Sequence, residues 1–244
     1  IKNWDRKPLG TVTPEQIIVN SSNVGMVQVS QQLEAKEIYE GLKKAGFGVR
    51  RGIELPNEEY GLFPDEQKLK TDPLVKATEA FGHGIAVTPL QLVTGIAEIA
   101  NGGYKIKPHL IKEVKNPNGE LVLQTDNNKN ERLYSEKTAE IIKGYMKANS
   151  ESGSGRNAQI EGYDSGSKTG TTTKLENGVY VNNKIIGSYV SFIPYNNPEY
   201  VMLILVDNPD PEFRFGSTTG VPIFKNIMEE VMRYKQIDHT IENN

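Results

Sequence analysis

The fold is decided by residues 168–206, which read KTGTTTKLENGVYVNNKIIGSYVSFIPYNNPEYVMLILV. Three runs in this stretch read as β-strands: Lys168–Thr173, Lys184–Ile193 and Tyr200–Val206. Asn182-Asn183 and the YNNP sequence at 195–198 are typical of tight turns between these runs. Because short turns join antiparallel neighbours, the stretch predicts a three-stranded antiparallel meander.

Helices are predicted on both sides of the meander. Val221–Tyr234 follows it as an amphipathic helix, and Thr88-Pro89 opens the clearest helix before it. Caps and turn residues predict further helices from Thr13-Pro14-Glu15, at Val24–Leu33, at Ala35–Ala45 and at Ser135–Ala148, and a hairpin of Lys105–Val114 with Leu121–Gln124. Residues 49–80 are rich in turn residues and charges and predict a long surface excursion. The chain is therefore expected to have a helical part at 1–150 and a sheet part at 160–236.

The bulk composition is that of an ordinary globular domain. The chain has 244 residues, 36% of them hydrophobic, which is enough to bury a real core. Its net charge of −3 and the lack of a basic stripe disfavour a nucleic-acid partner. It contains no cysteine, which excludes disulfides and thiolate chemistry. His83, His109 and His239 show no metal-ligand spacing, so the sequence predicts neither a metal nor a cofactor.

Two short polar motifs are candidates for chemistry: Ser21-Ser22-Asn23 and Lys168-Thr169-Gly170-Thr171. Because strand side chains alternate, Thr169 and Thr171 share one face, where two hydroxyls can donate to a carboxylate, and Lys168 points to the other face. Gly170 leaves room for a second backbone, and Lys168 adds positive charge that favours an anionic ligand. The strand is therefore suited to hold a peptide that ends in a carboxylate, added along its edge.

Each motif also has a purely structural interpretation. A Ser-x-Asn sequence is expected about once by chance in a chain of this length, and it fits a helix N-cap equally well. A lysine at the start of an edge strand is a common guard against aggregation.

The motifs and the stretches around them resemble class B penicillin-binding proteins. Ser-x-Asn and Lys-Thr-Gly belong to that family's signature set, and they occur here in the family's order. Further matching stretches are SSNVGM at 21–26, AGFG at 45–48, FGHGIAVTPLQL at 81–92, ANGG at 100–103 and FIPYNNPEYVMLILVDNP at 192–209. The 81–92 stretch is similar to septal, division-type or sporulation-type members, and the resemblance covers nearly the whole chain.

The resemblance implies a fold and an activity. The fold would be α/β of the α+β type, an antiparallel sheet flanked by helices as in penicillin-binding transpeptidases and serine β-lactamases, incomplete at its N-terminal side. The activity would be that of a peptidoglycan D,D-transpeptidase, which cross-links stem peptides ending in D-Ala-D-Ala and is inhibited covalently by β-lactams. The intact protein would be anchored by an upstream transmembrane helix, act at the extracytoplasmic face of the cell membrane and work with divisome membrane proteins.

The resemblance also implies roles for the motif residues. Ser21 would shuttle a proton between the nucleophile and the departing amine, with Lys168 holding it in a positive field. Asn23 would bind the substrate's peptide carbonyl or orient the lysine of the nucleophile motif. Thr169 and Thr171 would bind the terminal carboxylate, and the N–H of Thr171 would form half of the oxyanion hole.

One motif of the family, the nucleophile's Ser-x-x-Lys, is expected upstream of residue 1, in the same polypeptide or in a separate chain. The formal match Ser165-Gly166-Ser167-Lys168 is rejected, because the motif needs its serine and lysine one helical turn apart on the same face. Ser165 instead leads into a strand, and Ser167 stands where the family often has glycine. The isolated chain is therefore expected to be inactive.

Two alternatives stay open at this point. A non-catalytic β-lactam sensor or a degenerate transpeptidase would use the same residues as a binding module, and the upstream sequence would distinguish it from an enzyme. A serine β-lactamase is disfavoured by the stretches at 81–92 and 192–209.

Overall fold

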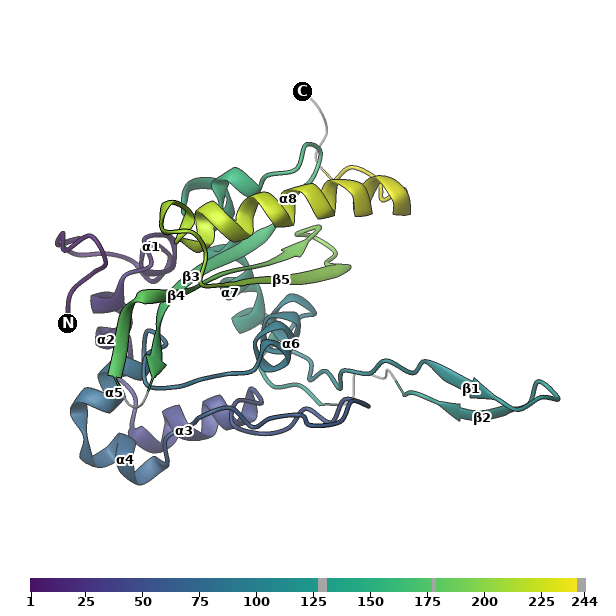
Figure 1. Cartoon of the computed structure of the whole chain (residues 1–244), viewed down its shortest axis with the longest axis horizontal. Helices are drawn as coiled ribbons and strands as arrows, with labels where there is room; N and C mark the ends of the chain where they lie inside the picture. The colour runs from purple at the N-terminus through teal and green to yellow at the C-terminus, as the bar shows by residue number, and fades with distance from the viewer. Residues whose placement is uncertain (127–130, 177–178, 241–244) are drawn as a thin grey trace.

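The computed structural model describes residues 1–126, 131–176 and 179–240. A three-stranded sheet lies between helices, and a separate hairpin projects from the body (Figure 1). The elements are α1 (Pro14–Val19), α2 (Asn23–Ser30), α3 (Ala35–Lys44), α4 (Glu66–Thr71), α5 (Pro73–Glu79), α6 (Pro89–Ala100), β1 (Glu113–Lys115), β2 (Leu121–Gln124), α7 (Glu136–Ser152), β3 (Gly166–Glu176), β4 (Val179–Ile193), β5 (Tyr200–Asp207) and α8 (Gly216–Lys235). The predicted mixed fold, an antiparallel sheet flanked by helices, is confirmed.

The predicted meander is confirmed in its order and direction. The strands pair as β3-β4-β5, and both pairs are antiparallel. The predicted turn at Asn182-Asn183 is wrong, because β4 begins at Val179 and continues through these residues. The register instead shifts there, since Thr173 pairs with Ile185 while Lys174 pairs with Val181. The asparagines therefore mark an irregularity within a longer strand.

Capping residues explain where the predicted helices begin. Thr13 closes a capping box with Gln16 at the start of α1, and Thr88 does the same with Gln91 at the start of α6. Each cap is followed by a proline at the first helical position, where its missing N–H is not needed. Both starts agree with the sequence prediction.

Other helices differ from the prediction. The expected surface excursion at 49–80 contains α4 and α5, which are capped by Asp65 and Asp72. These helices have six and seven residues, too few for apolar periodicity to reveal them. The last helix begins at Gly216 rather than Val221, and it includes Pro222 in its first turns.

The hairpin β1–β2 is confirmed, but its first strand is shorter than predicted and covers only Glu113–Lys115. Every residue of both strands is exposed, and the hairpin extends away from the other elements (Figure 1). It contributes nothing to the core. Among the described residues, no helix is long and apolar enough to cross a membrane.

Two apolar clusters cover the two faces of the sheet. Tyr189 packs with Phe224 and Val221 under α8, whereas Phe192 packs with Ala100 of α6 and Met146 of α7 on the opposite face. This division follows from strand alternation, because positions 189 and 192 of β4 point to opposite sides.

Glycines allow the start of α8 to lie directly on the sheet. A Cβ atom at Gly216 would come within 2.0 Å of the Ser188 carbonyl oxygen, and one at Gly220 would come within 2.6 Å of Tyr189 Cβ. Larger residues would push the helix away from the strands. The close packing brings the N-terminus of α8 beside the middle of β3.

Candidate active site

The first motif forms a sharp kink between α1 and α2. The N–H of Ser21 donates to Ile18 O at 3.2 Å, and the N–H of Ser22 donates to Ile17 O at 2.9 Å. This pattern is a Schellman ending of α1, with Ser21 in the left-handed conformation at φ 53°. A position of this kind usually holds glycine, so the chain keeps a hydroxyl here at a conformational cost.

The middle residue of the motif holds the kink in place. Ser22 is buried, and its Oγ accepts from Gly25 N at 3.0 Å as the N-cap of α2. The same hydroxyl donates to Asn3 Oδ1 at 3.1 Å, and this oxygen also accepts from Val24 N. The structural interpretation of the motif is therefore correct for Ser22, which leaves Ser21 free to point elsewhere.

The structure brings Ser21 and Lys168 together across 147 positions of sequence. Lys168 Nζ donates to Ser21 Oγ and also to the Thr169 carbonyl oxygen at 3.0 Å. Burial lowers the pKa of Lys168 to about 8, because desolvation disfavours the charged ammonium. The lysine is therefore mostly charged at neutral pH, yet it can lose its proton under mild conditions.

Asn23, the third residue of the motif, does not join this contact. It is the first residue of α2, and its Nδ2 donates to Lys2 O at 3.2 Å. It is only partly buried, and among the contacts of the described residues its side chain forms no hydrogen bond with Ser21 or Lys168.

The threonines of the second motif lie on the opposite face of β3 from Lys168, as predicted. Thr171 is exposed, and its Oγ1 accepts from Gly216 N, the first residue of α8, at 3.3 Å. The N-terminus of a helix carries partial positive charge, and α8 has no acidic residue in its first turn. This face of β3 therefore combines hydroxyl donors with a favourable field for an anion.

Helix α7 supports both halves of the site. Asn149 Nδ2 donates to Val19 O at the end of α1, at 3.3 Å. The next residue, Ser150, donates to Ser167 Oγ of β3 at 2.8 Å. These contacts fix the kink and the strand to the same helix end.

Sequence reasoning missed the residues of this support. The glycine- and serine-rich run at 150–155 predicts a loop, whereas α7 continues to Ser152, and no sequence pattern indicates a role for Asn149 or Asn3. The glycines and serines in 150–155 were a signal for close packing against a strand, but Asn3 and Asn149 are far from their partners in the sequence and carry no local signal.

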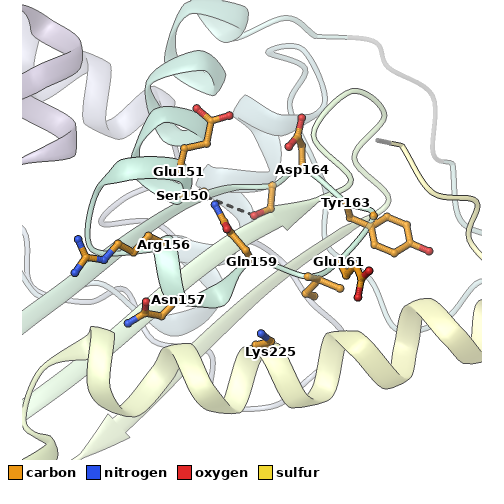
Figure 2. Close-up of a pocket in the computed structure, with 12 residues that line it drawn as sticks. Ser150, Glu151, Arg156, Asn157, Gln159, Glu161, Tyr163, Asp164 and Lys225 are labelled. Atoms are coloured by element: carbon orange, nitrogen blue, oxygen red, sulfur yellow. Dashed lines mark hydrogen bonds between the residues drawn. The ribbon is translucent and has the colours of Figure 1, made fainter. Parts of the chain in front are cut away.

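A cavity of about 700 Å³ lies on the other side of this support, between the end of α7 and α8 (Figure 2). Ser150 and Ser165 line it, and their hydroxyls are 3.5 Å apart. None of Ser21, Asn23 or the 168–171 motif lines it. Ser165 thus faces a different space from Lys168, which agrees with the rejection of 165–168 as a nucleophile motif.

No group of three or more acidic, histidine or cysteine side chains suited to a metal ion occurs in the described ranges. The ring of His83 stacks on Tyr180 of β4 at 5.5 Å between centroids, and that of His239 meets Tyr163 at 5.1 Å. Both histidines therefore have packing roles in the structure.

Known proteins match this chain over most of its length. A family model described as the penicillin binding protein transpeptidase domain matches residues 1–229. Stage V sporulation protein D of Bacillus subtilis is 35% identical over 232 residues, covering 94% of this chain and 35% of that protein. The peptidoglycan D,D-transpeptidase FtsI homolog of Mesostigma viride and a Neisseria meningitidis protein named "Probable peptidoglycan D,D-transpeptidase PenA" are each 30% identical to it, over 92% and 87% of this chain. The chain covers 40% and 34% of these two proteins, so it spans much less than their full length.

Two solved structures show the same fold. Penicillin-binding protein 3 of Mycobacterium tuberculosis, in complex with ampicillin, has a TM-score of 0.83 and 27% identity, covering 95% of this chain and 53% of that one. The transpeptidase domain of Burkholderia pseudomallei penicillin-binding protein 3 has a TM-score of 0.84 at 24% identity, covering 97% and 68%. The second likeness is to the fold alone.

Proposed function

The chain belongs to the family of penicillin-binding protein transpeptidase domains, and from this premise we propose that it is part of a peptidoglycan D,D-transpeptidase. The enzyme would cross-link stem peptides through a serine acyl-enzyme and would be inhibited covalently by β-lactams. The observation that carries the proposal is the contact of Lys168 Nζ with Ser21 Oγ. It joins the two family motifs into one site, although they lie far apart in the sequence.

In the proposed reaction, a serine hydroxyl attacks the carbonyl of the D-Ala-D-Ala bond and the C–N bond breaks. The serine's proton passes by way of Ser21 to the departing amine of D-alanine. Lys168 donates a hydrogen bond to Ser21, which makes that hydroxyl a better proton donor toward the leaving group. An amine from a neighbouring stem peptide then attacks the ester, forms the cross-link and returns a proton to the serine.

The other motif residues would bind the substrate. Thr169 and Thr171 would donate to its terminal carboxylate, aided by the N-terminus of α8 at Gly216. The N–H of Thr171 would stabilise the oxyanion. Asn23 would bind the peptide carbonyl, and Gly170 keeps the strand close to its neighbour, because a Cβ there would come within 2.5 Å of Ser188 Oγ.

We place the nucleophilic serine outside residues 1–244. The single Ser-x-x-Lys sequence in the chain is 165–168, and both of its serines are buried on the face away from the Lys168 ammonium. We also propose that the intact protein acts at the extracytoplasmic face of the cell membrane, anchored by a helix outside this chain, because peptidoglycan is cross-linked there.

The test is labelling with a fluorescent penicillin. We expect the pure 244-residue chain to stay unlabelled, and we expect a stable label once the preceding segment with Ser-x-x-Lys is supplied, in the same chain or as a second one. Labelling of the pure chain would overturn the upstream nucleophile. Rapid loss of the label with hydrolysed penicillin would indicate a β-lactamase instead. A stable label without cross-linking of stem peptides would indicate a sensor.

A further inference from the structure

A second hydroxyl contacts Thr169 on the face of β3 that carries both threonines of the motif. Ser154 Oγ lies 2.6 Å from Thr169 Oγ1, and both residues are partly buried. No other side chain of the described residues forms a hydrogen bond with the Thr169 hydroxyl. Ser154 lies two residues after the end of α7 at Ser152.

The backbone around Ser154 fits tightly against its surroundings. Its two neighbours are glycines, and a Cβ atom at Gly155 would come within 2.1 Å of Ser167 Oγ, while one at Gly153 would come within 2.4 Å of Asn149 Nδ2. Ser167 is fully buried and accepts the hydrogen bond of Ser150. The position of Ser154 is therefore set by close packing on both sides, which holds its hydroxyl at Thr169.

The hydrogen-bonding capacity of a hydroxyl gives this contact a direction. Each hydroxyl has one proton to donate and lone pairs that accept. If Ser154 donates to Thr169, the Thr169 proton is free to point at a ligand; if Thr169 donates to Ser154, it is not. A bound carboxylate accepts only, so it selects the first arrangement, in which the Ser154 bond also polarises the Thr169 hydroxyl.

We propose that Ser154 is a positioning residue for the carboxylate of the substrate, acting through Thr169. The inference rests on the proposed function, because it takes Thr169 as a carboxylate ligand. If this is correct, loss of the Ser154 hydroxyl weakens binding only of ligands that carry a negative charge at Thr169. A residue that only stabilised the loop would affect charged and uncharged ligands alike.

The experiment measures the second-order rate of acylation of the intact protein by benzylpenicillin and by its uncharged methyl ester. We expect Ser154→Ala to slow the reaction with benzylpenicillin about fivefold, the value of one ordinary hydrogen bond, and to leave the ester rate within about twofold. Ser154→Thr should restore the benzylpenicillin rate. In a Thr169→Val background, Ser154→Ala should have no further effect.

Ser152→Ala is the matched control. Ser152 lies two residues away, is exposed and donates only to Ala148 O, so its removal should change neither rate. Circular dichroism melting of each variant checks that the fold is kept.

The outcomes separate this inference from its premise. If the wild-type protein is not acylated, the proposed function fails and the inference fails with it. If Thr169→Val slows benzylpenicillin but Ser154→Ala does not, the function stands and the inference is wrong. An equal slowing of penicillin and ester by Ser154→Ala also overturns it, because that is the signature of a structural role.

Discussion

Two helix-end segments contact β3 from opposite sides, and they differ in how they do so. The kink at 20–23 places Ser21 on Lys168, on the side of the sheet that α6 and α7 cover. The segment at 150–155 places Ser150 and Ser154 on Ser167 and Thr169, on the face toward α8. Because adjacent residues of a strand point to opposite faces, the one short motif on β3 contacts both segments.

The difference between the segments is one of charge. The kink meets a cation whose pKa is lowered to about 8 by burial, whereas the 150–155 segment meets only neutral hydroxyls. We infer that the first contact serves proton transfer and the second serves ligand orientation. Both roles can be tested through the rate at which a penicillin acylates the intact protein.

The largest effect is expected for Lys168→Met, which removes the cation and keeps the length of the side chain. We expect acylation to fall roughly 10³-fold, because proton transfer and attraction of the anion are both lost. Lys174→Met is the control on the same strand, since Lys174 forms a surface pair with Asp207 at 2.8 Å. Equal rates for the two variants would contradict the role of Lys168.

The next effect separates the hydroxyl of Ser21 from its backbone. Ser21→Gly and Ser21→Ala should both slow acylation roughly 10²-fold. Their stabilities should differ, because glycine relieves the left-handed strain at φ 53° and alanine retains it, a difference of about 1 kcal/mol. Thermal unfolding measures this difference. If Ser21→Gly is acylated as fast as the wild-type protein, the Ser21 hydroxyl has no part in the reaction and the kink has only a structural role.

A smaller effect is expected from pH. Above pH 8 Lys168 loses its proton and its positive charge, so the attraction for an anionic penicillin weakens as pH rises. Acylation should fall about fivefold between pH 7 and pH 9.5, with a midpoint near 8, and the fall should be absent in Lys168→Met. A rate that rises through this range would instead identify Lys168 as the general base.

The smallest effects are expected where hydroxyls hold the two segments. Ser22→Ala removes the N-cap of α2 and its bond to Asn3, and Ser150→Ala removes a donor to the buried Ser167. Each should lower the free energy of unfolding by about 1 kcal/mol, measured by urea denaturation. Acylation should change less than tenfold in both variants. A larger loss would show that the residue takes part in the reaction and is not only structural.

The sequence predicted the parts of this site that depend on local pattern. Alternation along β3 separated Lys168 from Thr169 and Thr171, and the capping preferences of serine identified a helix start at the kink. It did not show which serine forms the cap, because Ser22 and Ser21 differ only in the backbone conformation that the end of α1 imposes. Proposing that Lys168 and Ser21 meet required the family resemblance.

The parts of the site and fold that the sequence did not predict depend mainly on contacts between distant segments. Asn149 forms a hydrogen bond with Val19, and Asn3 forms one with Ser22. Neither pair can be recognised from the residues around it in the sequence. The helices α4 and α5 were missed because their signals are capping aspartates rather than apolar periodicity. The Asn182-Asn183 turn was wrong because turn residues also suit a break in strand register.

A double-mutant cycle that combines Ser21→Gly with Lys168→Met, measured by penicillin acylation, tests whether the two side chains act together. If the two side chains act as one proton-transferring pair, the double variant should react about as fast as Lys168→Met alone. If the two losses multiply instead, Ser21 and Lys168 work independently, and their contact is not the basis of catalysis.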